Sequence, residues 1–124
     1  MIGKAYISVF KYYDVGNRKM SFKRRPVLVV GKADDSDYVI LPISRVTNRN
    51  NLDAHYDVAI DSTSTPLMNL SQRSYIRTHK QSVVHVGELV REIVNFKEEY
   101  SDIYLEVINK MKEFQEELYS NALR

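Results

Sequence analysis

The sequence predicts a small protein that is mainly β with C-terminal helices (α+β), built as an antiparallel barrel or sheet with helices appended. Short β-branched and aromatic runs, separated by turn-rich segments, occupy residues 5–86. After Gly87 the apolar residues recur at helical spacing instead. Strands do not alternate with helices, as a parallel sheet would require. The 124 residues are expected to form a single domain, with a barrel at about 4–87 and a helical tail at about 88–121.

Three strands are expected in the first third of the chain. Residues 5–13 are aromatic and β-branched throughout, and a basic, turn-rich loop follows them. The run Val27–Val30 predicts a buried strand that begins at Pro26, because proline has no amide proton to give to a neighbouring strand. Residues 38–44 predict the third strand. Its Pro42 indicates an edge position or a bulge.

The middle of the chain predicts three shorter strands. Residues 45–55 are polar and rich in asparagine, as in a loop. Residues 56–60 alternate polar and apolar side chains, as in a half-buried strand. The segment 66–70 suits a single helical turn, and short strands are expected at 74–79 and 82–86.

Two helices are expected at the C-terminal end. The first is predicted from the helical spacing of Leu89, Val90, Ile93 and Val94. The second is longer, and Ser101 is expected to cap it. Its apolar stripe consists of Tyr104, Val107, Ile108, Met111 and Leu118, with Phe114 beside it.

Charge is segregated along the chain although the net charge is only +2. Residues 1–32 and 66–87 are basic, with net charges of +7 and +3, whereas residues 33–65 and 88–124 each carry −4. The local sign of charge decides where a polyanion can bind. The basic blocks are therefore candidates for contact with a nucleic acid, although charge blocks of this size also occur as solvated faces.

Composition excludes several classes of protein. The sequence has no cysteine, so it has neither a disulfide framework nor a thiolate site. It begins without the apolar core of a signal peptide, and it contains no uncharged apolar segment of membrane-spanning length. The expected location is the cytoplasm, with no membrane partner.

Motifs for cofactors and metals are missing as well. The sequence contains no glycine-rich phosphate loop, no dinucleotide fingerprint and no HExxH motif. His55, His79 and His85 lack the spacing of metal ligands. No cofactor and no metal are expected.

Arg25 is the first candidate site residue. The residue before a proline is pushed towards extended backbone, so Arg25 is expected to be held at the mouth of the strand that begins at Pro26. A guanidinium on so rigid a base can grip a phosphate with two hydrogen bonds. The same stretch also fits a basic loop that only leads into a core strand.

Three segments resemble the MazF/PemK/Kid toxins of type II toxin–antitoxin systems. Arg25–Val30 is similar to the Arg-Pro-Val-Leu-Val-Ile strand of that family. Leu41–Ser44 lies where the family has a strand that ends in Ile-Thr or Ile-Ser. Ile76–Thr78 is similar to its Ile-Arg-Thr segment. The order and approximate spacing of the three segments agree over roughly residues 5–90.

The resemblance implies an SH3-like barrel, a homodimer and a metal-independent endoribonuclease that cleaves single-stranded RNA. It places Arg25 at the scissile phosphate and assigns a catalytic role to the hydroxyl of Ser44. It also implies a cognate antitoxin, which we expect to be acidic. The basic segments 18–25 and 73–80 are expected to form the groove for RNA. The expected RNA contacts are Lys23, Arg24, Arg45, Arg73, Ser74, Arg77, Thr78 and Lys80.

The identity of the general acid and base stays open. Some family members have an aspartate just before the Arg-Thr segment, but Arg73, Ser74 and Tyr75 occupy these positions here. His79 is a candidate for proton transfer near neutral pH. Two other functions are considered: a non-catalytic RNA-binding barrel, and a gyrase poison of the CcdB type. Those poisons end in a tail that contains tryptophan, which this chain lacks.

Overall fold

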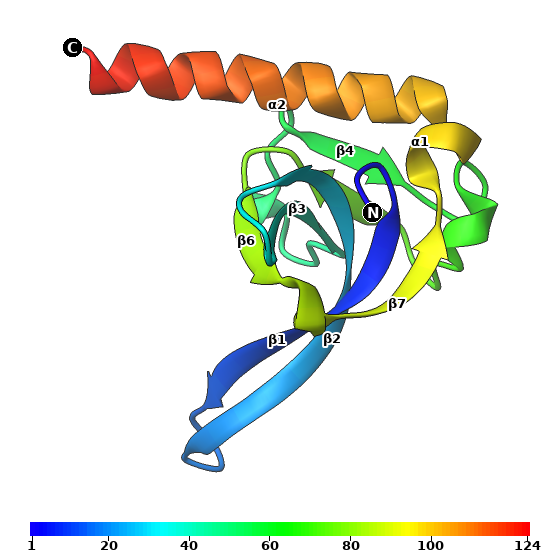
Figure 1. Cartoon of the computed structure of the whole chain (residues 1–124), viewed down its shortest axis with the longest axis vertical. Helices are drawn as coiled ribbons and strands as arrows, with labels where there is room; N and C mark the ends of the chain where they lie inside the picture. Colours follow the sequence, from blue (N-terminus) through cyan, green and yellow to red (C-terminus); the bar gives the residue numbers. More distant parts are fainter.

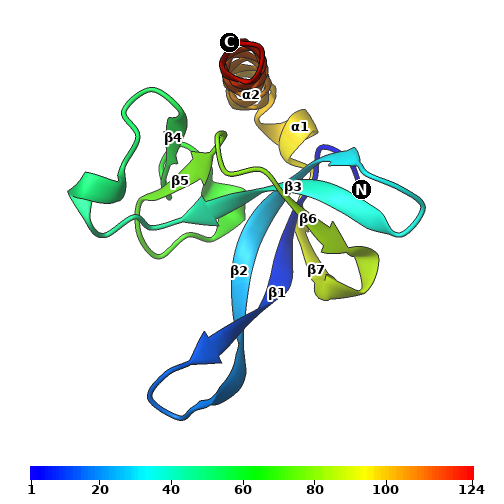
Figure 2. The same cartoon turned by 90° about the vertical axis from the view of Figure 1, so that its left-hand side faces the viewer.

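The computed structural model describes residues 1–124 as a strongly curved antiparallel sheet with a long helix across one end (Figures 1 and 2). The strands are β1 (Ala5–Asp14), β2 (Lys19–Lys32), β3 (Asp37–Ser44), β4 (Asp57–Ile60), β5 (Ser74–Arg77), β6 (Ser82–His85) and β7 (Leu89–Val94). The α-helices are α1 (Phe96–Glu99) and α2 (Ser101–Ala122), and single 3₁₀ turns lie at Arg49–Asn51, Pro66–Met68 and Val86–Glu88. The predicted fold class, mainly β with C-terminal helices, is confirmed.

The sheet is organised around β3. The strand order is β4-β5-β3-β2-β1-β7, and β6 also pairs with β3. One edge of β3 pairs with β2, and its other edge is divided between β6 at residues 37–40 and β5 at residues 43–44. Pro42 was expected at an edge position or a bulge: the edge position is wrong, and the register shift between β2 and β3 falls at Val29/Gly31 rather than at Pro42. Pro42 is tolerated because it lies in the gap between β6 and β5, where no partner on that side requires its missing donor.

β2 is longer than predicted and does not begin at Pro26. It begins at Lys19, so the basic segment before the proline is strand rather than loop. Pro26 marks the point where β2 leaves β3, since Val27 opposite Pro42 is the last pair between the two strands. Arg25 consequently lies inside a continuous strand, just beyond the body of the sheet.

The apolar run of β2 is buried on both faces, which explains why it is continuous rather than alternating. Leu28 packs into a cluster with Leu41, Ile76 and Phe96. Its neighbours Val27 and Val29 pack into a second cluster with Tyr6, Ile40 and Val84 on the opposite face. Val27, Leu28 and Val29 are all fully buried.

The helix predicted over residues 89–94 is wrong, because these residues form the strand β7. The pairs Leu89-Val90 and Ile93-Val94 fit helical spacing, but their β-branched members also suit a strand. Pairing with the free edge of β1 decides in favour of the strand. The helical part accordingly begins at Phe96 rather than near residue 88.

α2 packs across the end of the sheet through part of its predicted stripe. Val107 is fully buried, and Tyr104 and Met111 pack against the same core cluster. Leu118 stays 43% exposed because the last turns extend past the body of the protein (Figure 1). Ser101 is the first helical residue and not the cap. Tyr100 occupies the cap position and makes no side-chain capping bond.

The far part of the β1–β2 hairpin projects from the body on the side opposite α2 (Figures 1 and 2). β7 pairs with β1 only at residues 5–8, and β3 pairs with β2 only at residues 27–32. Residues 9–14 and 19–26 therefore form a two-stranded ribbon. No helix of the protein is both long and apolar enough to cross a bilayer.

Candidate functional site

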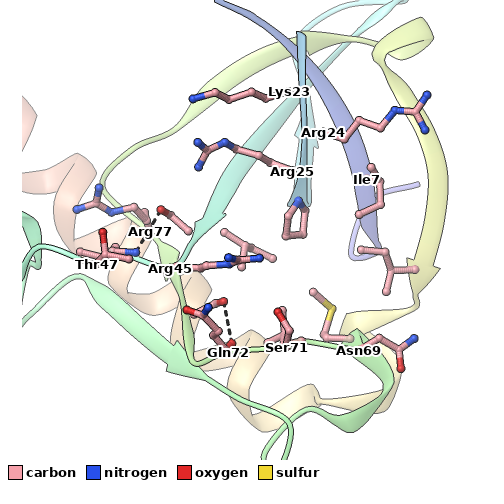
Figure 3. A pocket seen from close by; sticks show the side chains of 18 of the residues that line it. Ile7, Lys23, Arg24, Arg25, Arg45, Thr47, Asn69, Ser71, Gln72 and Arg77 are labelled. Carbon is pink, nitrogen blue, oxygen red and sulfur yellow. Dashed lines mark hydrogen bonds between the residues drawn. The ribbon is translucent and has the colours of Figure 1, made fainter.

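A groove of about 780 Å³ opens where the ribbon joins the body (Figure 3). Its walls come from β2 at residues 23–26, from the end of β3 and the loop after it at residues 43–48, and from the segment 68–72. Arg91 and Ile93 of β7 also line it. The curvature of the sheet therefore brings segments far apart in the sequence to one surface.

The groove is strongly cationic. None of its lining residues is an aspartate, a glutamate or a histidine. The basic lining residues are Lys23, Arg24, Arg25, Arg45, Arg77 and Arg91. A concave surface with charges of one sign focuses the electrostatic potential and attracts a ligand of the opposite sign. An anionic ligand suits this groove, and a polyanion can use several of the cations at once.

Arg25 has a free guanidinium in the groove, as do Arg24 and Arg45. The side chain of Arg25 is exposed on β2, where its backbone lies opposite Ser8, and the guanidinium forms no hydrogen bond or ion pair within the chain. Lys23 and Arg25 lie on one side of β2, whereas Arg24 and Ile7 lie on the other (Figure 3). The donors of Arg25 are thus available to a ligand, on a backbone that both β1 and Pro26 hold extended.

Ser44 also lines the groove, at the last position of β3. Its hydroxyl oxygen accepts a hydrogen bond from the backbone N–H of Val46 at 3.4 Å. Val46 has φ 43°, a left-handed conformation that β-branched residues rarely adopt. The Ser44 hydroxyl therefore supports a strained turn, and its own proton stays available for donation to a ligand. This turn brings Arg45 and Thr47 to the groove.

Arg77 lines the same groove but is held by other residues. Its Nε donates to Asp57 Oδ1 at 3.1 Å, and its Nη2 donates to Asp57 Oδ2 at 3.3 Å and to the carbonyl oxygen of Asn51 at 2.6 Å. The Asp57 side chain is fully buried and that of Arg77 is 17% exposed. Asp57 also accepts a hydrogen bond from the backbone N–H of Asp53 at 2.8 Å. This ion pair joins β4 to β5 and fixes the loop that precedes β4.

His79 lies away from the groove, beneath α2. Its ring packs beside Tyr56 and Phe114, with centroid separations of 5.9 and 6.1 Å. Its Nδ1 is buried without a hydrogen-bond partner, 3.8 Å from Asp57 Oδ1. Burial lowers the pKa of His79, and this outweighs the opposite effect of Asp57. His79 does not line the surface on which a ligand would react.

The other predicted RNA contacts fall into two groups. Ser74 and Thr78 are buried: the Ser74 hydroxyl donates to the carbonyl oxygen of Gln72 at 3.2 Å, and that of Thr78 to the carbonyl oxygen of Tyr56 at 2.6 Å. Ser74 lines the groove and Thr78 does not. Arg73 and Lys80 are exposed but lie outside the groove, and the guanidinium of Arg73 is 5.8 Å from the centre of the Tyr75 ring.

Arg91 lines the groove although its place there was not predicted from the sequence. Residues 89–94 were predicted to be helical. In the strand that they form, alternate side chains share a face, and this places Arg91 and Ile93 together. The amide side chains were also missed, because asparagine-rich loops are common. Those that line the groove are Asn48, Asn51, Asn69 and Gln72. No group of three or more histidine, cysteine, aspartate and glutamate side chains is placed so that it could hold a metal ion.

No protein-family model and no curated protein matches the sequence. Among solved structures, the chain is similar to the Mycobacterium tuberculosis toxin MazF-mt6, with 18% sequence identity and a TM-score of 0.49. The match covers 82% of this chain and 95% of the toxin. At this identity the likeness concerns only the path of the chain.

Proposed function

We propose that this chain is a metal-independent endoribonuclease that cleaves single-stranded RNA and acts as the toxin of a toxin–antitoxin pair. The observation that carries the proposal is the free guanidinium of Arg25 in a groove that six cationic side chains line and no carboxylate enters. RNA is the ligand class that fits, because it offers a row of phosphates and also carries its own nucleophile.

The reaction follows from these groups. The 2′-hydroxyl oxygen attacks the adjacent phosphorus, and the bond from phosphorus to the 5′-oxygen breaks. The products are a 2′,3′-cyclic phosphate and a 5′-hydroxyl. Extra negative charge develops on the phosphoryl oxygens in the transition state. Arg25 stabilises this charge with its planar pair of donors, and Ser44 donates one further hydrogen bond.

Proton transfer relies on solvent in this proposal. His79 is removed from the groove by its place under α2, and no carboxylate lines the groove. The proton of the 2′-hydroxyl therefore passes to water or hydroxide, and the leaving 5′-oxygen takes a proton from solvent. Catalysis then rests mainly on electrostatic stabilisation, which is often the largest single contribution in enzymes.

The missing acid and base favour one alternative, a non-catalytic RNA-binding protein. Such a protein would use the same cations to hold the strand without cleaving it. Affinity for RNA would fall with salt under both functions, with a slope of about −0.7 per phosphate contacted. Binding alone does not separate them.

Cleavage of a long mixed-sequence RNA in EDTA, with mapping of both new ends, tests the proposal. We expect fragments that end in a 2′,3′-cyclic phosphate and begin with a 5′-hydroxyl. Arg25→Ala serves as the inactive control, and Lys112→Ala, an exposed position on α2 outside the groove, as a control for the loss of one positive charge. RNA that is bound but stays intact would favour the alternative, and activity restored only by Mg²⁺ would indicate a different nuclease chemistry.

The remaining features of the proposal concern partners. An acidic antitoxin segment would occupy the cationic groove and exclude RNA from it, because both ligands need the same positive charges. We further propose a homodimer that acts in the cytoplasm, where RNA is the abundant polyanion. A competition titration of labelled RNA against the antitoxin tests the shared groove, and a ternary complex with full RNA affinity would contradict it.

A further inference from the structure

The ribbon beyond the groove exposes large apolar side chains on one face. Register pairs Val9 with Arg24, Lys11 with Phe22 and Tyr13 with Met20, and alternation puts these six residues on the same face. Phe22 is 62% exposed, Tyr13 57% and Met20 56%. A two-stranded ribbon is only marginally stable alone in water. Exposed aromatic residues on such a ribbon indicate a surface that a ligand covers.

This face continues the wall of the groove. Ile7 and Pro26 form the next pair on the same face, and both line the groove together with Arg24. A strand of RNA that leaves the groove on the side of Arg24 therefore meets Phe22 next and then Tyr13. No step or turn of the chain interrupts this path, because β1 and β2 pair without a register shift from residue 5 to residue 14.

The charge of the ribbon favours a polyanion over a second copy of the chain. Between residues 9 and 24 it carries five cationic side chains and only one carboxylate, that of Asp14. Two copies placed face to face would bring like charges together. Single-stranded RNA satisfies both features, since its phosphates pair with Lys11 and Arg24 and its bases stack on aromatic rings.

The opposite face of the ribbon is different. There the ammonium of Lys23 lies 4.3 Å from the centre of the Tyr12 ring. Tyr12 is half-buried, so its ring is already partly covered, whereas that of Phe22 is bare. Tyr12 therefore supplies a matched aromatic control within the same ribbon.

We propose that the face formed by Phe22 and Tyr13 is a stacking platform that binds unpaired bases flanking the nucleotides held in the groove. The inference rests on the proposed function, because its ligand is the same single-stranded RNA. It adds a second subsite, which would make the protein prefer long unpaired segments to short ones.

Affinity as a function of RNA length tests the platform. The probes are non-cleavable 2′-deoxy oligonucleotides of about 4 and 12 nucleotides, with 2-aminopurine at each position of the longer one in turn. We expect the longer probe to bind more tightly, and its flanking 2-aminopurine to be quenched. Phe22→Ala should weaken the binding of the longer probe about 10-fold, which is within the range for the loss of one stacked base. Binding of the short probe should not change.

Two further variants separate stacking from other roles. Phe22→Trp should preserve the extra affinity, whereas Phe22→Leu should lose it although the side chain stays apolar. Tyr12→Ala should have no effect on the length dependence. An unchanged length dependence in Phe22→Ala overturns the platform. A change from dimer to monomer in Phe22→Ala, measured as molecular mass in solution, also overturns it, because this face would then bind a second copy of the chain.

The outcome for the platform is independent of that for cleavage. Tighter binding of the longer probe that depends on Phe22 would support the platform even if the chain cleaved no RNA. If the chain cleaved RNA but its affinity did not depend on the length of the RNA, the result would support the endoribonuclease and contradict the platform.

Discussion

Arg25 and Arg77 line the same groove, yet their surroundings differ in every respect that matters for function. Arg25 is exposed on the two-stranded ribbon and has no partner in the chain. Arg77 is clamped at 3.1 Å to the buried carboxylate of Asp57. The sequence motif around an arginine therefore does not reveal whether the side chain serves a ligand or the fold, because this depends on the groups that it contacts.

The difference also separates two ends of the groove. The end at β2 offers free donors on a rigid strand, whereas the end at β5 is a fixed wall whose charges are already paired. A ligand phosphate at Arg77 would compete with Asp57, and removing Asp57 from its partner would leave a buried charge uncompensated. Under the proposed function, catalysis therefore belongs to the β2 end, and the β5 end only shapes the groove.

The largest effect on catalysis is expected for Arg25→Ala. The rate of RNA cleavage should fall by about 10²–10³-fold or more, because a donor to the developing charge is lost. The free energy of unfolding should change by no more than about 0.5 kcal/mol, since the side chain is exposed and unpaired. Arg25→Lys should also be slow, because an ammonium cannot reproduce the planar fork. Single-turnover kinetics and urea unfolding on the same preparations measure both quantities.

Arg77→Ala should reverse this pattern. Removing one member of a buried ion pair costs about 3–5 kcal/mol of stability, because the other charge is left without compensation. The control is Arg77→Met combined with Asp57→Leu, which removes both charges and should recover much of the loss. If Arg77→Ala were as stable as the parent in urea unfolding, the ion pair between Arg77 and Asp57 would not stabilise this side of the groove.

Ser44→Ala should have a smaller effect on cleavage than Arg25→Ala. We expect the rate to fall by roughly 10–10³-fold, through loss of one hydrogen bond to the phosphate and of support for the turn at Val46. Ser44→Thr keeps the hydroxyl and suits the end of a strand, so it should stay active. An inactive threonine variant would mean that the hydroxyl acts only on the turn or not at all.

His79 should produce the smallest effect, a dependence of stability on pH. Burial lowers its pKa below the usual value of 6.5, so the folded chain binds this proton less tightly than the unfolded chain. The free energy of unfolding should therefore be highest above about pH 6.5 and fall as the pH drops towards the folded pKa. Replacement by phenylalanine should remove this slope in urea titrations between pH 5 and 7. The low-pKa carboxylates Asp14, Asp53 and Asp61 lose their contributions only in more acidic solution, below about pH 4.

Local patterns predicted the strands whose side chains are sorted by burial, and they failed where pairing decides the structure. The buried run of β2 and the alternation of β4 were both visible in the sequence. Residues 19–25 were not, because Met20 and Phe22 are the only apolar residues among them and basic residues surround this short alternation. The strand β7 was predicted as a helix because the spacing of its apolar residues fits both a helix and a strand. Its pairing with the free edge of β1 decides in favour of the strand.

The candidate site was predicted in part for the same reason. Arg25 and Ser44 follow from short motifs, and both line the groove. The clamp on Arg77 was not predictable, because Asp57 lies 20 residues earlier in the sequence and meets it only through the pairing of β4 with β5. The place of Arg91 in the groove could be predicted only if residues 89–94 were predicted to form a strand.

Chemical rescue is the measurement that tests the division between the two arginines most directly. Arg25→Ala and Arg77→Ala are each assayed for RNA cleavage with increasing millimolar guanidinium, well below denaturing concentrations. Free guanidinium should restore part of the rate to Arg25→Ala, because it can occupy the space beside the scissile phosphate, and should leave Arg77→Ala unchanged. Rescue of Arg77→Ala without rescue of Arg25→Ala would contradict the account, since it would place the reacting phosphate at the β5 end of the groove.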